Sequence, residues 1–414
     1  MKYSRILILL AALGTSGAGT AAAQGSKPSL SVLYTFQGGA DGTYPSAGLA
    51  RDAKGVLYGV TRYGGTYNVG AVFRLTPPAA GSGLWSESTL HSFGSDGDGA
   101  QPDSSLTFDG SGNLYGTTGP PEVIAVGAVY ELQAPTSGGA WTERVVAYVG
   151  TDEYLSGPIA MNAQGDVFWE NSGESELQEQ SPVARSVVYA FTGGKFDQPE
   201  PFGGLTFDSS GSLYGTTQYG GFNGFGTVFQ VSPSGIKWTE STLFQFDKSS
   251  KLRLPESGVI FGPDGALYGT ALVSAVPDYG GGVFRLAPPA SPGGVWSEST
   301  ILTLTNSVGI SPSGGVAFDT KGNIYVASGG GGLITSNYPY GCGTIFKLIA
   351  PTQPGGAWTP GWVYSFTCGA DGANPVGTLV IRQDGTIYGV TSGVTIDGTN
   401  VGYGTVFQIE QLAN

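Results

Sequence analysis

Few residues of this chain have side chains of the kind that catalysis or metal binding most often requires. It contains one histidine, His91, and two cysteines, Cys342 and Cys368. A zinc site built from histidine and cysteine, or a histidine-dependent catalytic triad, needs more such groups. The glycine-rich stretch from Tyr219 to Gly226 lacks the spacing of a dinucleotide-binding fingerprint, and no helical pattern follows it. We therefore expect no metal site and no cofactor.

Carboxylates beside glycines form a second group of candidates. They occur in "ADG" at 40–42, "SDGDG" at 95–99 and "ADG" at 370–372. The complete twelve-residue calcium loop with its terminal glutamate is missing, so we favour ordinary Asp-Gly turns and keep calcium as the alternative. Asp41, Asp98 and Asp371 occupy equivalent loops of neighbouring repeats, which would place them around the mouth of a central channel.

Aromatic and amide side chains in long loops form the third group. Tyrosine and phenylalanine rings can stack on sugars, although packing between structural repeats would explain the same rings equally well. Together with the three aspartates they are our predicted ligand-binding residues: Tyr63, Tyr219, Phe222, Asn223, Asn337, Tyr338 and Tyr340.

An internal repeat must position these residues. The stretch "LYGTTQYGGFNGFGTVFQVSP" from Leu213 has related stretches along the whole chain, 46 to 63 residues apart. The aromatic residue of the "LYG" element falls at Tyr58, Tyr115, Phe168, Tyr214, Tyr268, Tyr325 and Tyr388. These are seven copies, of which the third, "DVFWENSGESELQEQSP", is degenerate. Repeats of this length are typical of solenoids and propellers.

Each copy contains four strand-sized runs, represented by 203–208, "LYGTT", 226–231 and 238–246. This predicts an all-β fold, a seven-bladed β-propeller with four antiparallel strands per blade. The chain begins with a fourth-strand sequence and ends with a third-strand sequence at 404–409. We therefore expect Ser31–Phe36 to complete the seventh blade, which removes the unpaired edges of an open array. Residues 31–414 would form this single domain.

The elements "LYGTT", "YGG" and "GTVFQV" resemble the GloVer tandem repeats, named for Gloeobacter and Verrucomicrobia, of secreted bacterial proteins. The resemblance covers nearly the whole chain after its first residues. It implies an exported propeller-like protein and implies no chemistry. A weaker similarity, to NHL-type propellers, implies that the "GLTFD" strand is the innermost of each blade.

Residues 1–23 have the pattern of a secretory signal peptide, with Lys2 and Arg5 before a short apolar run and small residues up to Ala23. We expect cleavage near Ala23, a short linker over 24–30, and a secreted or periplasmic monomer with no membrane span. The formal net charge of −13 excludes nucleic acid and anionic membranes as favoured partners.

The two cysteines are predicted to form a disulfide. Cys342 precedes the third strand of the sixth blade and Cys368 follows its fourth strand. Antiparallel pairing of those strands would bring the two thiols together, and export to an oxidising compartment would allow the bond.

Alternate connections emerge on opposite sides of a propeller. Those after second and fourth strands form what we call the loop face, which includes 62–69, 218–225, 329–342 and 392–403. Those after first and third strands form the turn face, with short Asp-x-x-Gly turns and proline-rich links. Binding residues usually lie on loops held by a rigid scaffold, so we expect function on the loop face.

Three hypotheses follow, and the first is favoured. The protein is a non-enzymatic scaffold that binds an extracellular polysaccharide or a protein partner. Alternatively, it is an extracytoplasmic hydrolase or lyase acting on polysaccharide or lactone at the channel mouth, with catalytic residues unknown. In the third hypothesis, the protein is a structural component of the cell envelope and has no binding or catalytic site.

Overall fold

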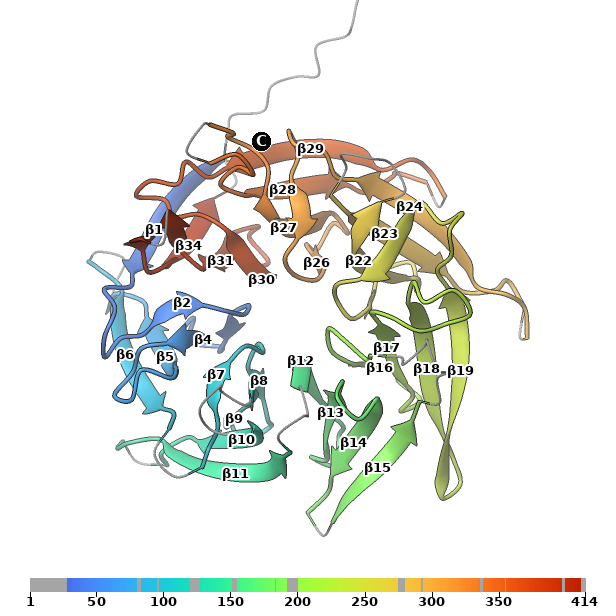
Figure 1. Ribbon diagram of the computed structural model, residues 1–414, viewed down its shortest axis with the longest axis horizontal. Coiled ribbons are helices and arrows are strands. Elements are labelled where there is room, and N and C mark those ends of the chain that lie inside the picture. The colour runs from blue at the N-terminus through green and yellow to red at the C-terminus, as the bar shows by residue number, and fades with distance from the viewer. Residues whose placement is uncertain are drawn as a thin grey trace, which may run out of the picture.

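Seven small sheets form a ring around a common axis in the computed structural model of the chain (Figure 1). The structure describes residues 28–79, 83–94, 97–119, 127–136, 138–150, 155–182, 184–191, 200–274, 280–291, 293–335, 338–353, 355–396 and 399–410. Over these residues there is no α-helix, and thus none that could cross a membrane. The predicted fold class, an all-β seven-bladed propeller, is confirmed.

The blades follow one another along the chain. Blade one contains β2 (Thr43–Pro45), β3 (Ala50–Arg51), β4 (Leu57–Tyr63), β5 (Ala71–Thr76) and β6 (Ser86–Ser92). Blade two contains β7 (Ala100–Pro102), β8 (Thr107–Phe108), β9 (Leu114–Gly119), β10 (Gly127–Gln133) and β11 (Thr142–Val149). Blade three contains β12 (Leu155–Met161), β13 (Val167–Asn171), β14 (Glu176–Gln180) and β15 (Arg185–Ala190). Blade four contains β16 (Thr206–Phe207), β17 (Leu213–Thr217), β18 (Thr227–Ser234) and β19 (Lys237–Gln245).

The second half of the ring repeats this pattern. Blade five contains β20 (Leu252–Pro255), β21 (Ile260–Phe261), β22 (Leu267–Ser274), β23 (Gly282–Ala287) and β24 (Ser297–Thr303). Blade six contains β25 (Ile310–Pro312), β26 (Ala317–Phe318), β27 (Ile324–Gly330), β28 (Thr344–Ile349) and β29 (Thr359–Ser365). Blade seven contains β30 (Pro375–Ile381), β31 (Ile387–Thr391), β34 (Thr405–Glu410) and β1 (Ser29–Thr35). A separate hairpin, β32 (Val394–Ile396) and β33 (Thr399–Gly402), lies in its loop between β31 and β34.

The ring is closed by the N-terminal strand, as the sequence predicts. Strand β1 pairs antiparallel with β34, from Ser29 opposite Glu410 to Thr35 opposite Thr405. The strand begins at Ser29, so its first two residues come from the segment expected to be linker. They join the sheet because β34 extends to Glu410 and offers them a partner.

The innermost strand of most blades is longer than the "GLTFD" run and consists of two parts. In blade one, β2 and β3 both pair with β4, on either side of a break at 46–49. The first part ends at a proline that the sequence analysis did not include in a strand. The residue before that proline has a positive φ in five blades: Tyr44, Gln101, Leu254, Ser311 and Asn374.

This conformation lets each of those residues hydrogen bond to the preceding blade. Their backbone N–H groups donate to the carbonyl oxygens of Tyr403, Val69, Phe225, Gly280 and Cys342 respectively, over 2.6 to 3.0 Å. The residue after each acceptor is a glycine with positive φ: Gly404, Gly70, Gly226, Gly281 and Gly343. A Cβ atom on any of these glycines would lie less than 3.0 Å from the proline of the next blade. We call this recurring arrangement the glycine–proline contact.

A second constraint explains the "LYG" motif. Gly215 of β17 lies opposite Phe229 of β18, and a Cβ atom on Gly215 would overlap that ring. The same pairing joins Gly59 to Phe73, Gly269 to Phe284 and Gly389 to Phe407. The glycine therefore leaves room for the aromatic side chain that fills the blade.

Blade three is complete although its sequence is degenerate. Trp169 of β13 replaces the glycine, and Gln178 of β14, directly opposite, replaces the phenylalanine. The large side chain has moved to the neighbouring strand, so the blade interior stays filled. Arg185 lies over the Trp169 ring, 5.5 Å from its centre, and donates to Gln178 Oε1 at 2.5 Å.

Blade three also contains a buried carboxyl group near the axis. Glu170 is 1% exposed, and its Oε2 accepts a hydrogen bond from the backbone N–H of Gly204 in blade four at 2.7 Å. Its Oε1 atom is buried and has no hydrogen-bond partner. Burial raises the pKa of Glu170 to about 8, and the hydrogen bond from Gly204 opposes this only in part. The side chain is therefore protonated at neutral pH.

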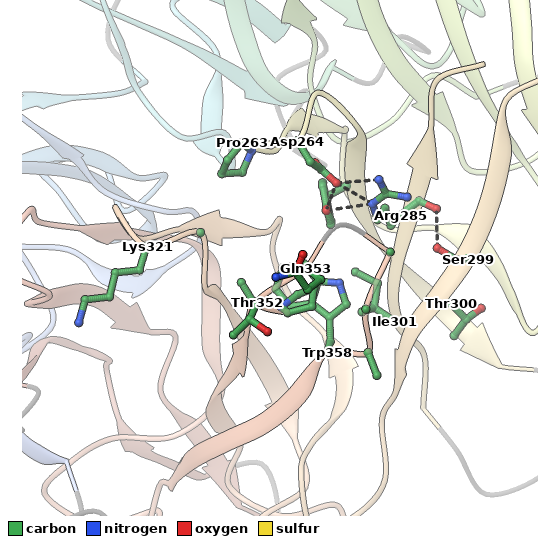
Figure 2. A pocket seen from close by; sticks show the side chains of 17 residues that line it. Pro263, Asp264, Arg285, Ser299, Thr300, Ile301, Lys321, Thr352, Gln353 and Trp358 are labelled. Atoms are coloured by element: carbon green, nitrogen blue, oxygen red, sulfur yellow. Dashed lines mark hydrogen bonds and ion pairs between the residues drawn. The ribbon is translucent and has the colours of Figure 1, made fainter. Parts of the chain in front are cut away.

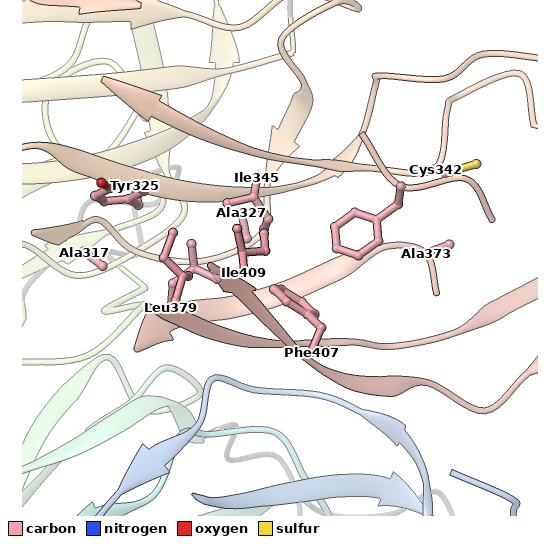
Figure 3. Packing of buried hydrophobic residues seen from close by; sticks show 11 residues of the cluster. Ala317, Tyr325, Ala327, Cys342, Ile345, Ala373, Leu379, Phe407 and Ile409 are labelled. Carbon is pink, nitrogen blue, oxygen red and sulfur yellow. The ribbon is translucent and has the colours of Figure 1, made fainter. Parts of the chain in front are cut away.

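The hydrophobic core lies mainly between neighbouring blades. Figure 3 shows one such cluster, in which Tyr325, Ala327 and Ile345 of blade six meet Leu379 and Phe407 of blade seven. Each blade thus buries both of its faces, which is why second strands such as β17 and β31 are buried at every residue.

The predicted disulfide between Cys342 and Cys368 is confirmed, with Cα atoms 5.3 Å apart. It joins the segment before β28 to the loop after β29. Cys342 is also the carbonyl acceptor of the glycine–proline contact to blade seven, so the bond fixes one of the five inter-blade hydrogen bonds.

Replacing Gly226 by alanine tests the glycine–proline contact. The new methyl group would meet Thr217 O at 2.5 Å and Pro255 Cδ at 2.6 Å. Gly224 also has a positive φ but has open space around it, so Gly224→Ala is the matched control for backbone strain of about 1–2 kcal/mol. We expect Gly226→Ala to lower the free energy of unfolding by at least about 2 kcal/mol more, measured by urea denaturation. Equal effects of the two changes would contradict the packing role.

Replacing both cysteines by serine should lower the free energy of unfolding by roughly 3 kcal/mol, because the loop they close restricts the unfolded chain. Thermal unfolding of the two forms, with and without reductant, measures this. Wild-type protein that behaves the same in both conditions would show that the bond contributes nothing.

Glu170→Gln should stabilise the protein, relative to wild type, increasingly as pH rises. The folded state holds a proton on Glu170 up to about pH 8, whereas an ordinary glutamate releases it near 4.5. Between these values the unfolded state binds fewer protons, so the wild-type protein loses up to about 1.4 kcal/mol of stability per pH unit. The glutamine side chain of the variant cannot titrate, so the stability difference between variant and wild type should grow from pH 5 to pH 8.

The control is Glu174→Gln, at an exposed position of the same blade. Urea denaturation at several pH values should give a constant difference for this control. A constant difference for Glu170→Gln as well would show that Glu170 is ionised in the folded protein.

Candidate functional site

A pocket on the turn face, between blades five and six, combines aromatic and charged side chains (Figure 2). Its volume is about 550 Å³. The turn 263–264 and strands β23 and β24 contribute from blade five. The turn 321–322 and the link 350–358 contribute from blade six.

A tyrosine–aspartate–arginine group forms one side of the pocket. Tyr268 Oη donates to Asp264 Oδ2 at 3.0 Å, and Arg285 Nε donates to the same oxygen at 2.8 Å. A second guanidinium nitrogen, Nη2, lies 2.7 Å from Asp264 Oδ2. Burial alone would raise the pKa of Asp264, but the hydrogen bonds from Arg285 and Tyr268 outweigh it and hold that pKa below its usual value. The carboxylate is therefore ionised.

The "LYG" repeat places this tyrosine. Because Tyr268 is the second residue of β22, its hydroxyl reaches the turn that precedes the strand. Tyr58, Tyr214 and Tyr325 reach their own turn aspartates in the same way. Burial, followed by the hydrogen bond to Asp264, raises the pKa of Tyr268 to about 12, so the hydroxyl keeps its proton.

Trp358 of the next blade forms the other side. Its ring centre lies 5.9 Å from that of Tyr268 in an edge-on arrangement, and Phe318 contacts Tyr268 in the same way at 5.1 Å. Figure 2 shows Gln353 and Thr352 beside Trp358, while Lys321 lies at the edge and points away from it. A partly exposed indole facing an Arg–Asp pair is a suitable surface for a polar ring with apolar C–H groups.

The three predicted aspartates have structural roles in the loops after fourth strands. Asp41 accepts hydrogen bonds from Tyr34 and from the backbone of Gln37. Asp371 accepts the corresponding bonds from Tyr364 and Thr367. Asp98, which is 1% exposed, accepts from Gly94 N and lies 2.7 Å from His91 Nε2.

Tyr34, His91 and Tyr364 belong to fourth strands, the outermost of their blades, so these carboxylates lie beside outer strands and do not surround the channel mouth. The tight loop requires an acceptor seven residues after the strand's tyrosine or histidine, and this requirement explains the recurrence of aspartate. His91 is correspondingly half-buried, with 17% of its side chain exposed.

The predicted aromatic and amide residues lie in separate loops of different blades. Phe222 and Tyr340 are the most exposed, at 91% and 77%, while Tyr219 and Asn223 are exposed in the same loop as Phe222. Tyr63 contacts Tyr44 edge-on at 5.8 Å. Tyr338 is half-buried against the cluster of Figure 3, and Asn337 lies outside the described residues. Ligand binding by these residues remains a prediction.

Carboxyl groups near the axis are the functional candidates that the sequence analysis missed. Asp103 and Glu256 each directly follow the proline of an inner strand, in blades two and five. Asp103 retains accessible surface but is enclosed by protein, and this desolvation raises its pKa to about 6 despite the opposing charge of Arg62. Burial raises the pKa of Glu256 to about 7, opposed by a hydrogen bond from Gln218. The sequence does contain a signal for these two residues, because each directly follows a proline that recurs at the same place in several repeats.

Within the described residues, no three His, Cys, Asp or Glu side chains lie close enough to hold a metal ion. The calcium alternative therefore gains no candidate ligand set there.

Comparison with known proteins supports the fold. No curated protein matches the sequence. A catalytically inactive variant of virginiamycin B lyase from Staphylococcus aureus, solved with quinupristin, has 13% identity and a TM-score of 0.56. The match covers 93% of this chain and all of that one. The extracellular domain of a protein assigned as a one-component system of B. thetaiotaomicron gives 11% identity and a TM-score of 0.55, over 91% of this chain and 39% of that one.

At these identities the likeness shows the propeller fold alone. The repeat itself is more specific: the sequence model of the Gloeobacter/Verrucomicrobia repeat matches residues 7–169. Over these residues the match confirms the resemblance to the Gloeobacter/Verrucomicrobia repeat. The later "LYG" and "GTVFQV" elements, such as those at 213–217 and 226–231, lie beyond the matched residues.

Proposed function

We propose that this protein is an exported, non-enzymatic propeller that binds an extracellular polysaccharide. The observation that carries the proposal is the pocket between blades five and six, where Trp358 faces the Arg285–Asp264 pair. This site lies on the turn face, whereas we had expected binding on the loop face.

The chemistry of the pocket matches that of a sugar. A pyranose ring has a C–H face that packs on an indole and hydroxyl groups that bond to charged side chains. Because Asp264 already orients Arg285 and Tyr268, these groups lose little freedom on binding a ligand.

Export rests on two supports. Residues 1–23 have the pattern of a signal peptide, and the Cys342–Cys368 disulfide fits an oxidising compartment. The alternative within the scaffold hypothesis is that the protein binds another protein through the loop face, where Phe222 and Tyr340 are exposed.

Trp358→Ala should lower glycan affinity at least about tenfold. A glycan array identifies a ligand, and isothermal titration with that glycan measures its affinity. The matched control is Trp238→Ala, since Trp238 contacts Phe168 between blades three and four at the same 5.9 Å but is not among the residues that line the pocket. Arg285→Gln is a second variant that keeps the aromatic packing.

Equal loss of affinity in Trp358→Ala and Trp238→Ala would indicate a general stability effect. No binding of any glycan at millimolar concentration, together with recovery of a specific protein from envelope extract, would favour the protein-partner alternative.

The rival function, a hydrolase or lyase, is favoured by a different observation. Asp103 and Glu256 directly follow inner strands, and Glu170 lies in the second strand of blade three. Desolvation raises the pKa of each toward neutrality, as proton transfer to a substrate requires. Turnover of a polysaccharide or lactone that is lost in Glu256→Gln and kept in Trp358→Ala would establish this rival and contradict our proposal.

A further inference from the structure

A second pocket on the turn face, between blades one and two, has the same framework as the first. It is lined by Tyr58, Arg74 and Trp141 among other residues, and its volume is about 590 Å³. Tyr58 and Tyr268 hold the same position of the repeat, as do Arg74 and Arg285. Both arginines lie directly opposite their tyrosine across the sheet.

The geometry of the two pockets agrees closely. Trp141 lies 6.0 Å from Tyr58, where Trp358 lies 5.9 Å from Tyr268. The tyrosine hydroxyl donates to a turn aspartate in both, to Asp52 at 3.3 Å in the second pocket. Other junctions have a different residue opposite the aromatic, such as Glu179 opposite Phe168. An arginine in this place is thus shared by these two pockets.

The second pocket differs in its positive charge. Arg51 and Lys54 line it together with Arg74, on a protein whose formal net charge is −13. The Nε atom of Arg51 is itself buried, so an anionic ligand group would be attracted by the parts of the three cationic side chains that line the pocket.

The two carboxylates that line the pocket are held by hydrogen bonds within their own turns. Asp52 accepts hydrogen bonds from the backbone of Lys54 and Val56 and from Tyr58. Asp109 accepts from the backbone of Ser111 and from Asn113. Both carboxylates are thus used by their own turns. The cations have contacts of their own, since the charge of Arg51 acts on Asp384 of blade seven and Arg74 Nε donates to Ser88 Oγ at 3.2 Å. A ligand would bind to their remaining N–H groups and to Lys54.

We propose that the pocket between blades one and two is a second glycan subsite that selects a carboxylated sugar. The proposal rests on the glycan-binding function given above and adds the substrate class. Trp141 packs on the sugar ring, while Arg51 and Arg74 bind its carboxylate. A uronic-acid polysaccharide that contacts both pockets gains avidity, because the second contact is made within the same complex.

Titration with trigalacturonic acid, using maltotriose as the neutral probe, tests this subsite on the full-length mature protein. We expect two sites for trigalacturonic acid in the wild type. Arg51→Gln and, separately, Lys54→Gln should weaken one site about tenfold, make its affinity less dependent on salt, and leave the Trp358-dependent site unchanged. Lys237→Gln removes a charge from the turn face at blade four and should change neither site.

The outcomes separate the two proposals. One site that Trp358→Ala abolishes and Arg51→Gln does not affect would overturn the second subsite and leave the proposed function standing. Equal affinity for both probes at the blade one–two pocket would overturn carboxylate selection. No saturable binding of either probe would contradict both proposals. Thermal unfolding of each variant identifies any that fails to fold.

Discussion

The glycine–proline contact is the interaction on which the ring depends. A backbone N–H group just before the proline of one blade bonds to a carbonyl oxygen of the preceding blade, and the glycine beside that carbonyl gives the proline ring its space. Both backbones need positive φ angles, which cost a non-glycine residue such as Leu254 about 1–2 kcal/mol. The hydrogen bond and the close packing offset this cost at the five junctions that have the contact, and there they fix how neighbouring blades are spaced around the axis.

The pockets follow from the same spacing on the opposite face. Because each blade is held at one distance from the next, the tyrosine of one "LYG" strand meets the phenylalanine and tryptophan of its neighbour, as Tyr58 and Tyr268 do. The repeat therefore supplies an aromatic framework at several junctions, and single substitutions opposite the tyrosine decide which of them carries a charge. Function can diverge here without disturbing the fold.

The sequence was sufficient for the architecture but not for the site. Strand order, ring closure and the disulfide depend on local patterns and on antiparallel neighbours, so they could be predicted. The pocket joins Asp264 and Arg285 to Trp358, which belong to different blades, and no local pattern shows that they meet. Asp41, Asp98 and Asp371 were predicted to bind a ligand because an aspartate recurs at this place in the repeat. It recurs because the loop after the fourth strand needs a hydrogen-bond acceptor. Glu170 was overlooked because a degenerate repeat hides its equivalence to buried positions in other blades.

Closure by strand β1 has a consequence for how the molecule is made. Thr35 pairs with Thr405, so nearly the whole propeller must be synthesised before the first strand finds its partner. Until then Ser29–Thr35 has no partner strand, so blade seven cannot be completed before β34 has been synthesised. The N-terminal strand thus closes the ring only after the C-terminal strand has been made. A chain interrupted before β34 would lack the partner of β1, and its ring would stay open.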